Sequence, residues 1–227
     1  DDTKKIIEFY QKKDSRIKVI QTEGIGRGKC LNLALNNCRG KYVGNIDADD
    51  PSHPQRLEIE LKFLESHDYA LICTESLKIW DDSKPIWREY KIENINIIDV
   101  TKSLVFYNPV CHSSVLIRKD VLNKVGNYDD NRVSQFDYEL WVRLAANGYK
   151  LGKLNIKLSS KRLHKKQSFE RRRRIQYLLS TMKVQKTAIN KLNGPSYLYI
   201  FLFLRFIYGT LPLPVRVVLR SIRSLLS

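Results

Sequence analysis

Cysteine and methionine are scarce in this chain of 227 residues, which has four Cys, one Met and no Cys-x-x-Cys pair. This spacing excludes a zinc knuckle and a dense disulfide framework, so we expect reduced thiols in a cytosolic compartment. Long apolar runs are also missing, since residues 197–208 fall short of the roughly 20 residues of a membrane-spanning helix. The chain opens at Asp1 without the charged and then apolar segment that is typical of a secretory signal.

Acidic residues are few relative to basic ones. The chain has 24 Asp and Glu against 40 Lys and Arg, a formal charge of +16. This excess favours a polyanionic partner, namely nucleic acid, an anionic membrane surface or a phosphorylated substrate, and charge alone does not choose among them. With 43% hydrophobic and 28% charged residues, the composition indicates a folded domain and excludes a disordered or collagen-like chain.

Helical and strand patterns alternate along the first half of the chain and predict an α/β fold with a mostly parallel sheet. We expect strands at residues 17–20, 41–46, 69–73 and 114–117. We expect helices at residues 3–13, 31–38, 54–64, 95–106, 133–146, 175–192 and 197–208, and a hairpin or an irregular excursion at 80–87. The three tryptophans, Trp80, Trp87 and Trp141, are expected in the core.

Asp47 and Asp49 follow the expected strand at residues 41–46 directly. Ligands of an open α/β sheet bind beyond the carboxyl ends of its strands. Two acids one residue apart on such a turn can share Mg²⁺ or Mn²⁺, which would hold a diphosphate. The alternative is that Asp49 or Asp50 caps the helix expected from residue 54.

Several motifs surround these acids in a fixed order. They are Gly24-Ile25-Gly26-Arg27-Gly28-Lys29-Cys30-Leu31-Asn32, Arg39-Gly40-Lys41-Tyr42-Val43, Asn45-Ile46-Asp47-Ala48-Asp49-Asp50 and Pro54-Gln55-Arg56-Leu57-Glu58. This set resembles the nucleotide-binding half of the family 2 inverting glycosyltransferases. Residues 108–116, 126–129 and 136–144 are similar to the acceptor half of the same family.

The resemblance implies a GT-A, Rossmann-like nucleotide-diphospho-sugar transferase fold over residues 1–168. Within it, residues 1–75 would bind the donor and residues 76–168 the acceptor, and residues 169–227 would form a helical tail. The implied activity is metal-dependent, inverting transfer of a sugar from a nucleotide-sugar donor, UDP-linked, to a cell-surface glycan or lipid-linked acceptor.

Individual roles follow from the same resemblance. Asp47 and Asp49 match the family's Asp-x-Asp pair, in which Asp49 would be the principal contact to Mn²⁺ or Mg²⁺. Asp137 matches the acid of a Glu-Asp-Tyr-x-Leu-Trp motif and would be the general base. His164 matches a late histidine that reaches the metal or diphosphate. The alternatives are that Asp137 caps its helix and that His164 is a solvated surface residue.

Other site residues are expected on the two sides of the pocket. Arg27, Lys29 and Asn32 are expected on the donor side, where the two cations would meet phosphate charge, and a solvated loop is the alternative. His112 and Trp141 are expected on the acceptor side. Their alternatives are a buried, hydrogen-bonded histidine and a core tryptophan.

Two departures from the family pattern are visible. The family's opening strand, helix and second strand have no counterpart, and Asp1-Asp2-Thr3 resembles the segment that follows them. We therefore expect a chain that lacks this N-terminal unit, with raw sheet edges and with an oligomer or partner completing the sheet. The second departure is Gln135-Phe136, where the family commonly has an acid directly before the base.

The basic C-terminal part leaves further function classes open. Arg216, Arg220 and Arg223 keep helical spacing beside apolar residues and predict an amphipathic helix on the cytoplasmic face of an anionic membrane. A helix packed on the domain or in a dimer interface is the alternative. The basic run at residues 161–174 keeps a nucleic-acid-binding protein open, although no recognised module is present. A third class is an inactive GT-A fragment or interaction module.

Overall fold

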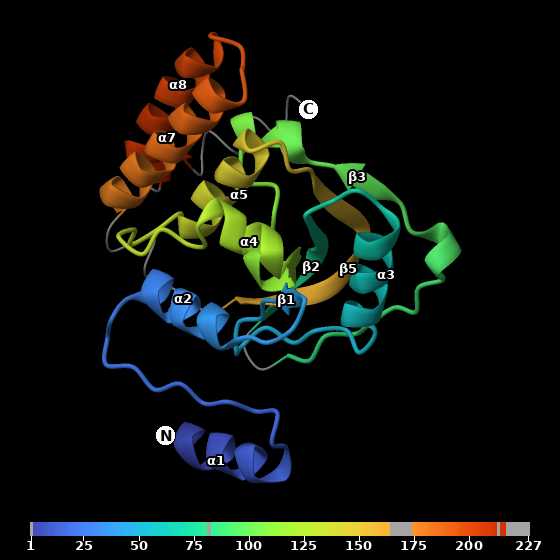
Figure 1. The fold of residues 1–227 in the computed structure, drawn as a ribbon. Helices are drawn as coiled ribbons and strands as arrows, with labels where there is room; N and C mark the ends of the chain where they lie inside the picture. The colour runs from blue at the N-terminus through green and yellow to red at the C-terminus, as the bar shows by residue number, and fades with distance from the viewer. Residues whose placement is uncertain (1, 81–82, 164–173, 213, 217–227) are drawn as a thin grey trace.

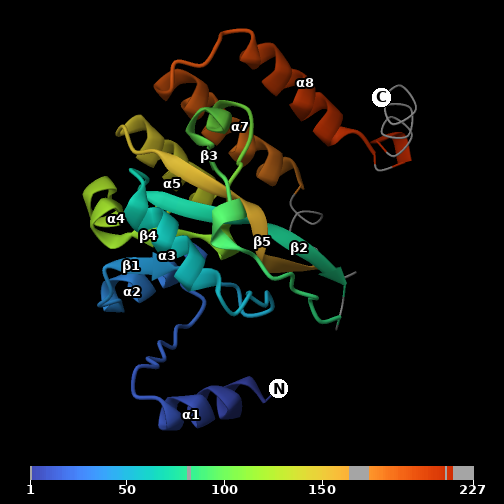
Figure 2. The same ribbon diagram turned by 90° about the vertical axis from the view of Figure 1, so that its right-hand side faces the viewer.

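The protein has an α/β fold with helices on both faces of one five-stranded sheet (Figures 1 and 2). The computed structural model describes residues 2–80, 83–163, 174–212 and 214–216. The strands are β1 (Tyr42–Gly44), β2 (Leu71–Trp80), β3 (Ile97–Asp99), β4 (Leu116–Arg118) and β5 (Leu151–Leu163). The α-helices are α1 (Thr3–Lys13), α2 (Arg27–Asn37), α3 (Arg56–Ser66), α4 (Lys119–Val125), α5 (Phe136–Ala146), α7 (Arg174–Lys191) and α8 (Leu198–Thr210). Short 3-10 turns lie at Ile92–Asn94, Thr101–Val105 and His112–Ser114.

The sheet is mixed, and the prediction of a mostly parallel sheet is wrong. The strand order is β1-β4-β2-β5-β3, and among these described strands only β2 and β5 pair in parallel, from Leu71 opposite Leu151 to Trp80 opposite Leu163. β1 and β2 both pair antiparallel with β4, so they run in the same direction. Strands that run in the same direction need a crossover connection, and α3 supplies it. β4, which follows a short 3-10 turn, lies between them in the opposite direction.

Alternate residues of β2 pack on opposite faces of the sheet, as the period of a strand requires. Ile72 packs in a cluster with Ile59 and Phe63 of α3 on one face. Leu71 packs on the other face, in a cluster that includes the fully buried Trp141 of α5. Burial of each such side chain contributes about 1.5–3 kcal/mol to folding.

Two expected elements differ from the structure. Residues 17–20 form no strand because no strand of the described chain lies beside them to share backbone hydrogen bonds. The helix expected at residues 95–106 is instead β3 and a 3-10 turn, since Ile97 pairs with Leu154 of β5. At residues 80–87 the described part is an excursion and not a hairpin, because β2 runs on to Trp80 beside β5 and residues 83–91 contain no strand.

The tryptophans divide between core and surface. Trp141 is fully buried, Trp87 is half-buried, and Trp80 is 63% exposed at the end of β2. The core prediction is therefore confirmed for Trp141 and wrong for Trp80.

The ends of the described chain pack differently. α1 buries no residue and lies apart from the sheet in both views (Figures 1 and 2). β1 and β3 are the edges of the described sheet, and a partner that completes it stays a prediction. α8 packs on α7 and on the 3-10 turn at Val105 through Leu198 and Leu202.

The expected helix around Arg220 and Arg223 lies outside the described residues, and so does most of the basic run at 161–174. None of the helices in the described chain is both long enough and apolar enough to cross a bilayer.

Candidate active site

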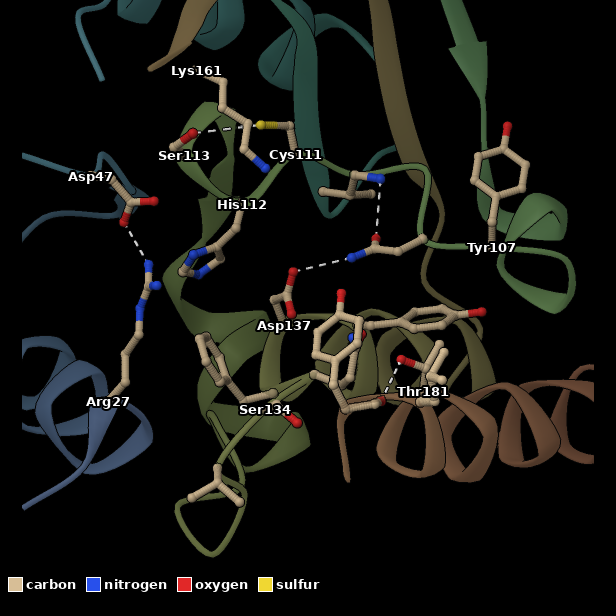
Figure 3. A pocket seen from close by; sticks show the side chains of 18 of the residues that line it. Arg27, Asp47, Tyr107, Cys111, His112, Ser113, Ser134, Asp137, Lys161 and Thr181 are labelled. Carbon is tan, nitrogen blue, oxygen red and sulfur yellow. Dashed lines mark hydrogen bonds and ion pairs between the residues drawn. The ribbon is translucent and has the colours of Figure 1, made fainter. Parts of the chain in front are cut away.

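A cavity of about 860 Å³ opens where the N-termini of α2 and α5 meet the turn that follows β1. Figure 3 shows Arg27 and Asp47 on one side of it and Asp137 on the other, with His112 between them. All four side chains are expected site residues, and all four line the cavity. Sequence positions more than 100 residues apart therefore meet in one space.

The donor side is held together by an ion pair. The Arg27 guanidinium donates to the Asp47 carboxylate at 2.5 Å, and it lies over the ring of Phe136 at 5.4 Å. Arg27 is the first residue of α2 and follows Gly26. Gly26 has a φ of 92°, a backbone conformation that residues other than glycine rarely adopt. The glycine loop therefore sets the direction in which Arg27 enters the site.

The rest of the expected donor residues do not line the cavity. The Asn32 amide pairs with the backbone of Tyr128 in both directions, at 2.8 and 3.0 Å, and so fixes α2 against that loop. A Cβ on Gly28 would lie 3.1 Å from the Asp130 backbone, which explains the glycine at this close approach. Lys29 is exposed on the helix surface.

The acidic turn is anchored to β5. Asp49 is exposed, whereas Asp50 is buried and accepts a hydrogen bond from the Arg162 backbone N–H at 2.8 Å. Burial raises the pKa of Asp50, the charges of Asp49 and Asp47 add to the rise, and the Arg162 N–H opposes it. Because α3 begins at Arg56 after Gln55, the helix-cap interpretation of Asp49 and Asp50 is wrong.

A buried ion pair supports the strand that leads into this turn. The Arg56 guanidinium donates to both carboxylate oxygens of Glu60 at 3.0 and 3.2 Å. It also donates to the carbonyls of Asn45 and Val115 at 3.0 and 3.2 Å. Asn45 lies two residues before Asp47, so Arg56 fixes the backbone from which the acidic turn departs.

Asp137 stands in the first turn of α5 and does not cap it. The cap position belongs to Gln135, at φ 58°, a conformation uncommon for a side-chain residue. Asn108 donates to the Asp137 carboxylate at 3.1 Å, and the Val110 N–H holds the Asn108 amide oxygen at 3.2 Å. The carboxylate is thereby directed into the cavity, as Figure 3 shows.

His112 is held as a neutral imidazole between the two sides. The Asn45 amide donates to Nδ1 at 3.1 Å, so Nε2 carries the proton and donates to the Tyr128 hydroxyl at 2.8 Å. Burial lowers the pKa of His112, while the Asp137 carboxylate acts in the opposite direction. Burial also raises the pKa of Tyr128 well above its ordinary value, so its hydroxyl stays protonated.

This arrangement makes folding stability depend on pH. Because the pKa of His112 is lowered, the unfolded chain binds a proton at mildly acidic pH that the folded chain does not. Stability is therefore fully present above the unfolded pKa of about 6.5 and falls as the pH drops. We expect His112→Gln to flatten the fall between about pH 6.5 and 5 in urea denaturation. The control His67→Gln, at an exposed histidine, should lose stability with falling pH as the unaltered chain does. If His112→Gln loses stability to the same extent, other groups cause the pH dependence.

Trp141 and His164 are the remaining expected site residues. Trp141 is fully buried, with its ring centre 6.2 Å from that of His112, so it supports the imidazole from the core. His164 lies outside the described residues.

Asp47 and Asp49 are the two acids expected to hold a divalent cation; Asp47 lines the cavity and is paired with Arg27, and Asp49 is exposed. No three His, Cys, Asp or Glu side chains of the described chain gather closely enough to hold a metal ion. Mg²⁺ and similar hard cations are commonly bound by one or two carboxylates together with substrate phosphates. A metal held by this carboxylate pair and a diphosphate stays a prediction.

Comparison with known proteins agrees with this arrangement. The model of glycosyl transferase family 2 matches residues 1–126, more than half of the chain. The chain belongs to glycosyl transferase family 2. It is 34% identical over 146 residues to an uncharacterised glycosyltransferase of Methanocaldococcus jannaschii, covering 64% of this chain and 50% of that one. It is 29% identical over 140 residues to the O-antigen biosynthesis glycosyltransferase WbnJ of Escherichia coli, covering 62% and 54%. The family 2 chain thus spans about half the length of these curated relatives.

Solved structures show the same fold. The mannosyltransferase PcManGT of Pyrobaculum calidifontis, in complex with GDP-Man and Mn²⁺, superposes with a TM-score of 0.63 at 17% identity, over 99% of this chain and 68% of that one. The S. aureus protein TarS, with UDP-GlcNAc, gives 0.59 at 16% identity, over 83% and 54%. The fold is therefore the GT-A nucleotide-sugar transferase fold.

Several residues that line the cavity of this family 2 chain were not expected from the sequence. They are Asp50, Asn108, Gln135, Lys161 and Arg205. Two of them carried a usable signal: Asn108 opens a segment similar to the acceptor half, and Arg205 is the only charge in the run at 197–208. Lys161 was missed together with β5, although Leu154, Ile156 and Leu158 alternate with polar residues as a strand requires.

Proposed function

We propose that this chain transfers a sugar with inversion from a UDP-linked donor to a glycan or lipid-linked acceptor at the cytoplasmic face of a membrane. The observation that carries the proposal is the single cavity that joins Arg27 and Asp47 to Asn108 and Asp137. Membership of glycosyl transferase family 2 and relatives named for O-antigen and amylovoran biosynthesis support it. The solved neighbours with UDP, UDP-GlcNAc and GDP-Man support a nucleotide-sugar donor.

The proposed division of labour follows the two sides of the cavity. Residues 1–75 would bind the donor and residues 76–168 the acceptor, and the tail helices α7 and α8 would close the acceptor end through Thr181 and Arg205. The cavity is large enough for a sugar nucleotide and part of an acceptor, since ligand pockets commonly measure about 300–1,000 Å³.

The chemistry needs a base on one side and positive charge on the other. The Asp137 carboxylate takes the proton of the acceptor hydroxyl as its oxygen bonds to the anomeric carbon, while the bond to the diphosphate breaks. Asn108 keeps the carboxylate oriented toward that hydroxyl. Arg27 places positive charge where the leaving diphosphate gains negative charge. A bound Mn²⁺ or Mg²⁺ at Asp49 and Asp47 would add positive charge to the same oxygens.

Titration calorimetry with UDP, with and without Mn²⁺, tests the donor side at physiological salt. We expect UDP to bind only in the presence of Mn²⁺, and Asp49→Ala to abolish that binding, because one carboxylate of the pair is lost. Asp68→Ala, at a fully exposed acid two residues after the end of α3, should bind as the unaltered chain does.

The other outcomes overturn parts of the proposal. If UDP binds equally well with and without Mn²⁺, and Asp49→Ala does not change that affinity, the site does not use a metal to bind UDP. No UDP or GDP binding by the folded chain would favour an inactive GT-A fragment. Salt-dependent affinity for DNA without any nucleotide binding would favour the nucleic-acid class.

A further inference from the structure

The tail helix α8 is apolar on both of its sides. Leu198 and Leu202 are each 5% exposed and pack against the domain. A Cβ on Gly209 would lie 2.7 Å from the Leu178 side chain, so the glycine permits the close approach of α8 to α7. Leu198, Leu202 and Gly209 are the buried residues of α8, and most of its large apolar side chains stay exposed.

The outer face of α8 consists of four large apolar residues at positions i, i+3, i+4 and i+7. They are Ile200, Phe203, Leu204 and Ile207, which are 64, 58, 53 and 43% exposed. Figure 2 shows α8 on the outer side of α7, away from the sheet. A helix that is apolar all round is normally buried on both sides, so the outer face requires an apolar occupant.

The charge of the tail restricts what that occupant can be. Residues 171–227 contain eleven Lys and Arg and no Asp or Glu. Lys183, Lys186 and Lys191 are exposed on α7, the helix on which α8 packs. A second copy of this chain would bring a second acid-free tail against the first, and like charges oppose that contact. Nucleic acid would satisfy the charges but offers no hydrocarbon to cover the outer face.

We propose that the outer face of α8 inserts into the surface of an anionic lipid bilayer. Apolar side chains enter the boundary between headgroups and acyl chains, and the exposed lysines of α7 meet the anionic headgroups. The four residues of the outer face are the surface that lies in the membrane, and the rest of the domain stays in water.

Docking through α8 would also bring the acceptor end of the cavity close to the lipid surface. Arg205 of α8 lines the cavity, and its guanidinium donates to the Phe106 carbonyl at 3.4 Å. Phe106 and Tyr107 are about half exposed beside it, and Tyr107 lines the cavity too. Since a helix is about 10–12 Å across, the acceptor end lies within one helix diameter of the lipid surface. This step rests on the proposed function, and it favours an acceptor that is itself anchored in lipid.

Vesicle flotation tests the docking directly. The whole chain is mixed with vesicles of phosphatidylcholine alone or of phosphatidylcholine with phosphatidylglycerol. We expect binding to the mixed vesicles and at least tenfold weaker binding of Ile200→Ser/Ile207→Ser, because apolar area is lost from the outer face. Ile86→Ser/Ile98→Ser removes two exposed isoleucines elsewhere and should bind as the unaltered chain does.

A second pair of variants tests how much the positive charge of the tail contributes to vesicle binding. Lys183→Gln/Lys186→Gln should weaken binding by about fivefold per charge, and Lys18→Gln/Lys62→Gln at exposed sites off the tail should not.

Equal binding to both kinds of vesicle, or none to either, would overturn the proposal. So would sedimentation as a dimer that Ile200→Ser/Ile207→Ser converts to a monomer. Calorimetry with UDP and Mn²⁺ on the same variants separates the two proposals, because the outer face lies off the donor side.

Discussion

Asp137→Asn is expected to lower the rate of sugar transfer by about 10²–10⁴-fold, because an amide cannot take the proton of the acceptor hydroxyl. Binding of UDP with Mn²⁺ should change little, since the substitution keeps the size of the side chain. The Asn108 amide can still donate to the remaining oxygen, so the local structure is also retained. The measurement is UDP release from a UDP-sugar in the presence of acceptor, beside calorimetry of the same preparation.

The control for this variant lies on the same helix. Glu139 pairs with Arg143 at 2.9 Å and does not line the cavity, so Glu139→Gln makes the same acid-to-amide change outside the site. It should keep the transfer rate. Full turnover by Asp137→Asn would assign the base to another residue, and loss of UDP binding would make Asp137 a donor ligand.

Arg56→Met is expected to lower the free energy of unfolding by about 3–5 kcal/mol. The change leaves the fully buried Glu60 and the part-buried Asn45 carbonyl without the Arg56 donor. The Val115 carbonyl loses one of two donors and keeps the Asn45 N–H. Burial raises the pKa of Glu60 and the Arg56 guanidinium opposes that rise, so the loss of Arg56 favours the protonated carboxyl. Urea denaturation measures the loss.

A second substitution separates stability from positioning. Arg56→Met/Glu60→Leu removes the unpaired carboxyl, and we expect it to recover most of the lost stability. The Asn45 carbonyl still lacks the Arg56 donor, so UDP binding with Mn²⁺ should remain weaker than in the unaltered chain. Lys124→Met, which breaks an exposed pair with Asp120, should cost no more than about 1 kcal/mol. An equally small cost for Arg56→Met would show that the buried pair adds nothing to stability.

Elements with a purely local signal were predicted well, and elements that depend on pairing were not. The helix at α5 has a clear apolar face, and the structure has it at Phe136–Ala146. Residues 95–106 carry apolar side chains that suit either a helix or a strand, and only their contact with β5 makes Ile97–Asp99 a strand. Residues 17–20 have a strand-like composition and no neighbouring strand in the described chain, so they form none.

The sequence by itself determined the chemical groups of the site and their order, from Arg27 and Asp47 to Asp137. Only the tertiary structure decided which groups support them. The Asn108 amide reaches Asp137 from 29 positions away, and the Arg162 N–H reaches Asp50 from 112. Such contacts form only when strands and helices pack together. Their strength depends on distance and burial, which no local pattern of residues encodes.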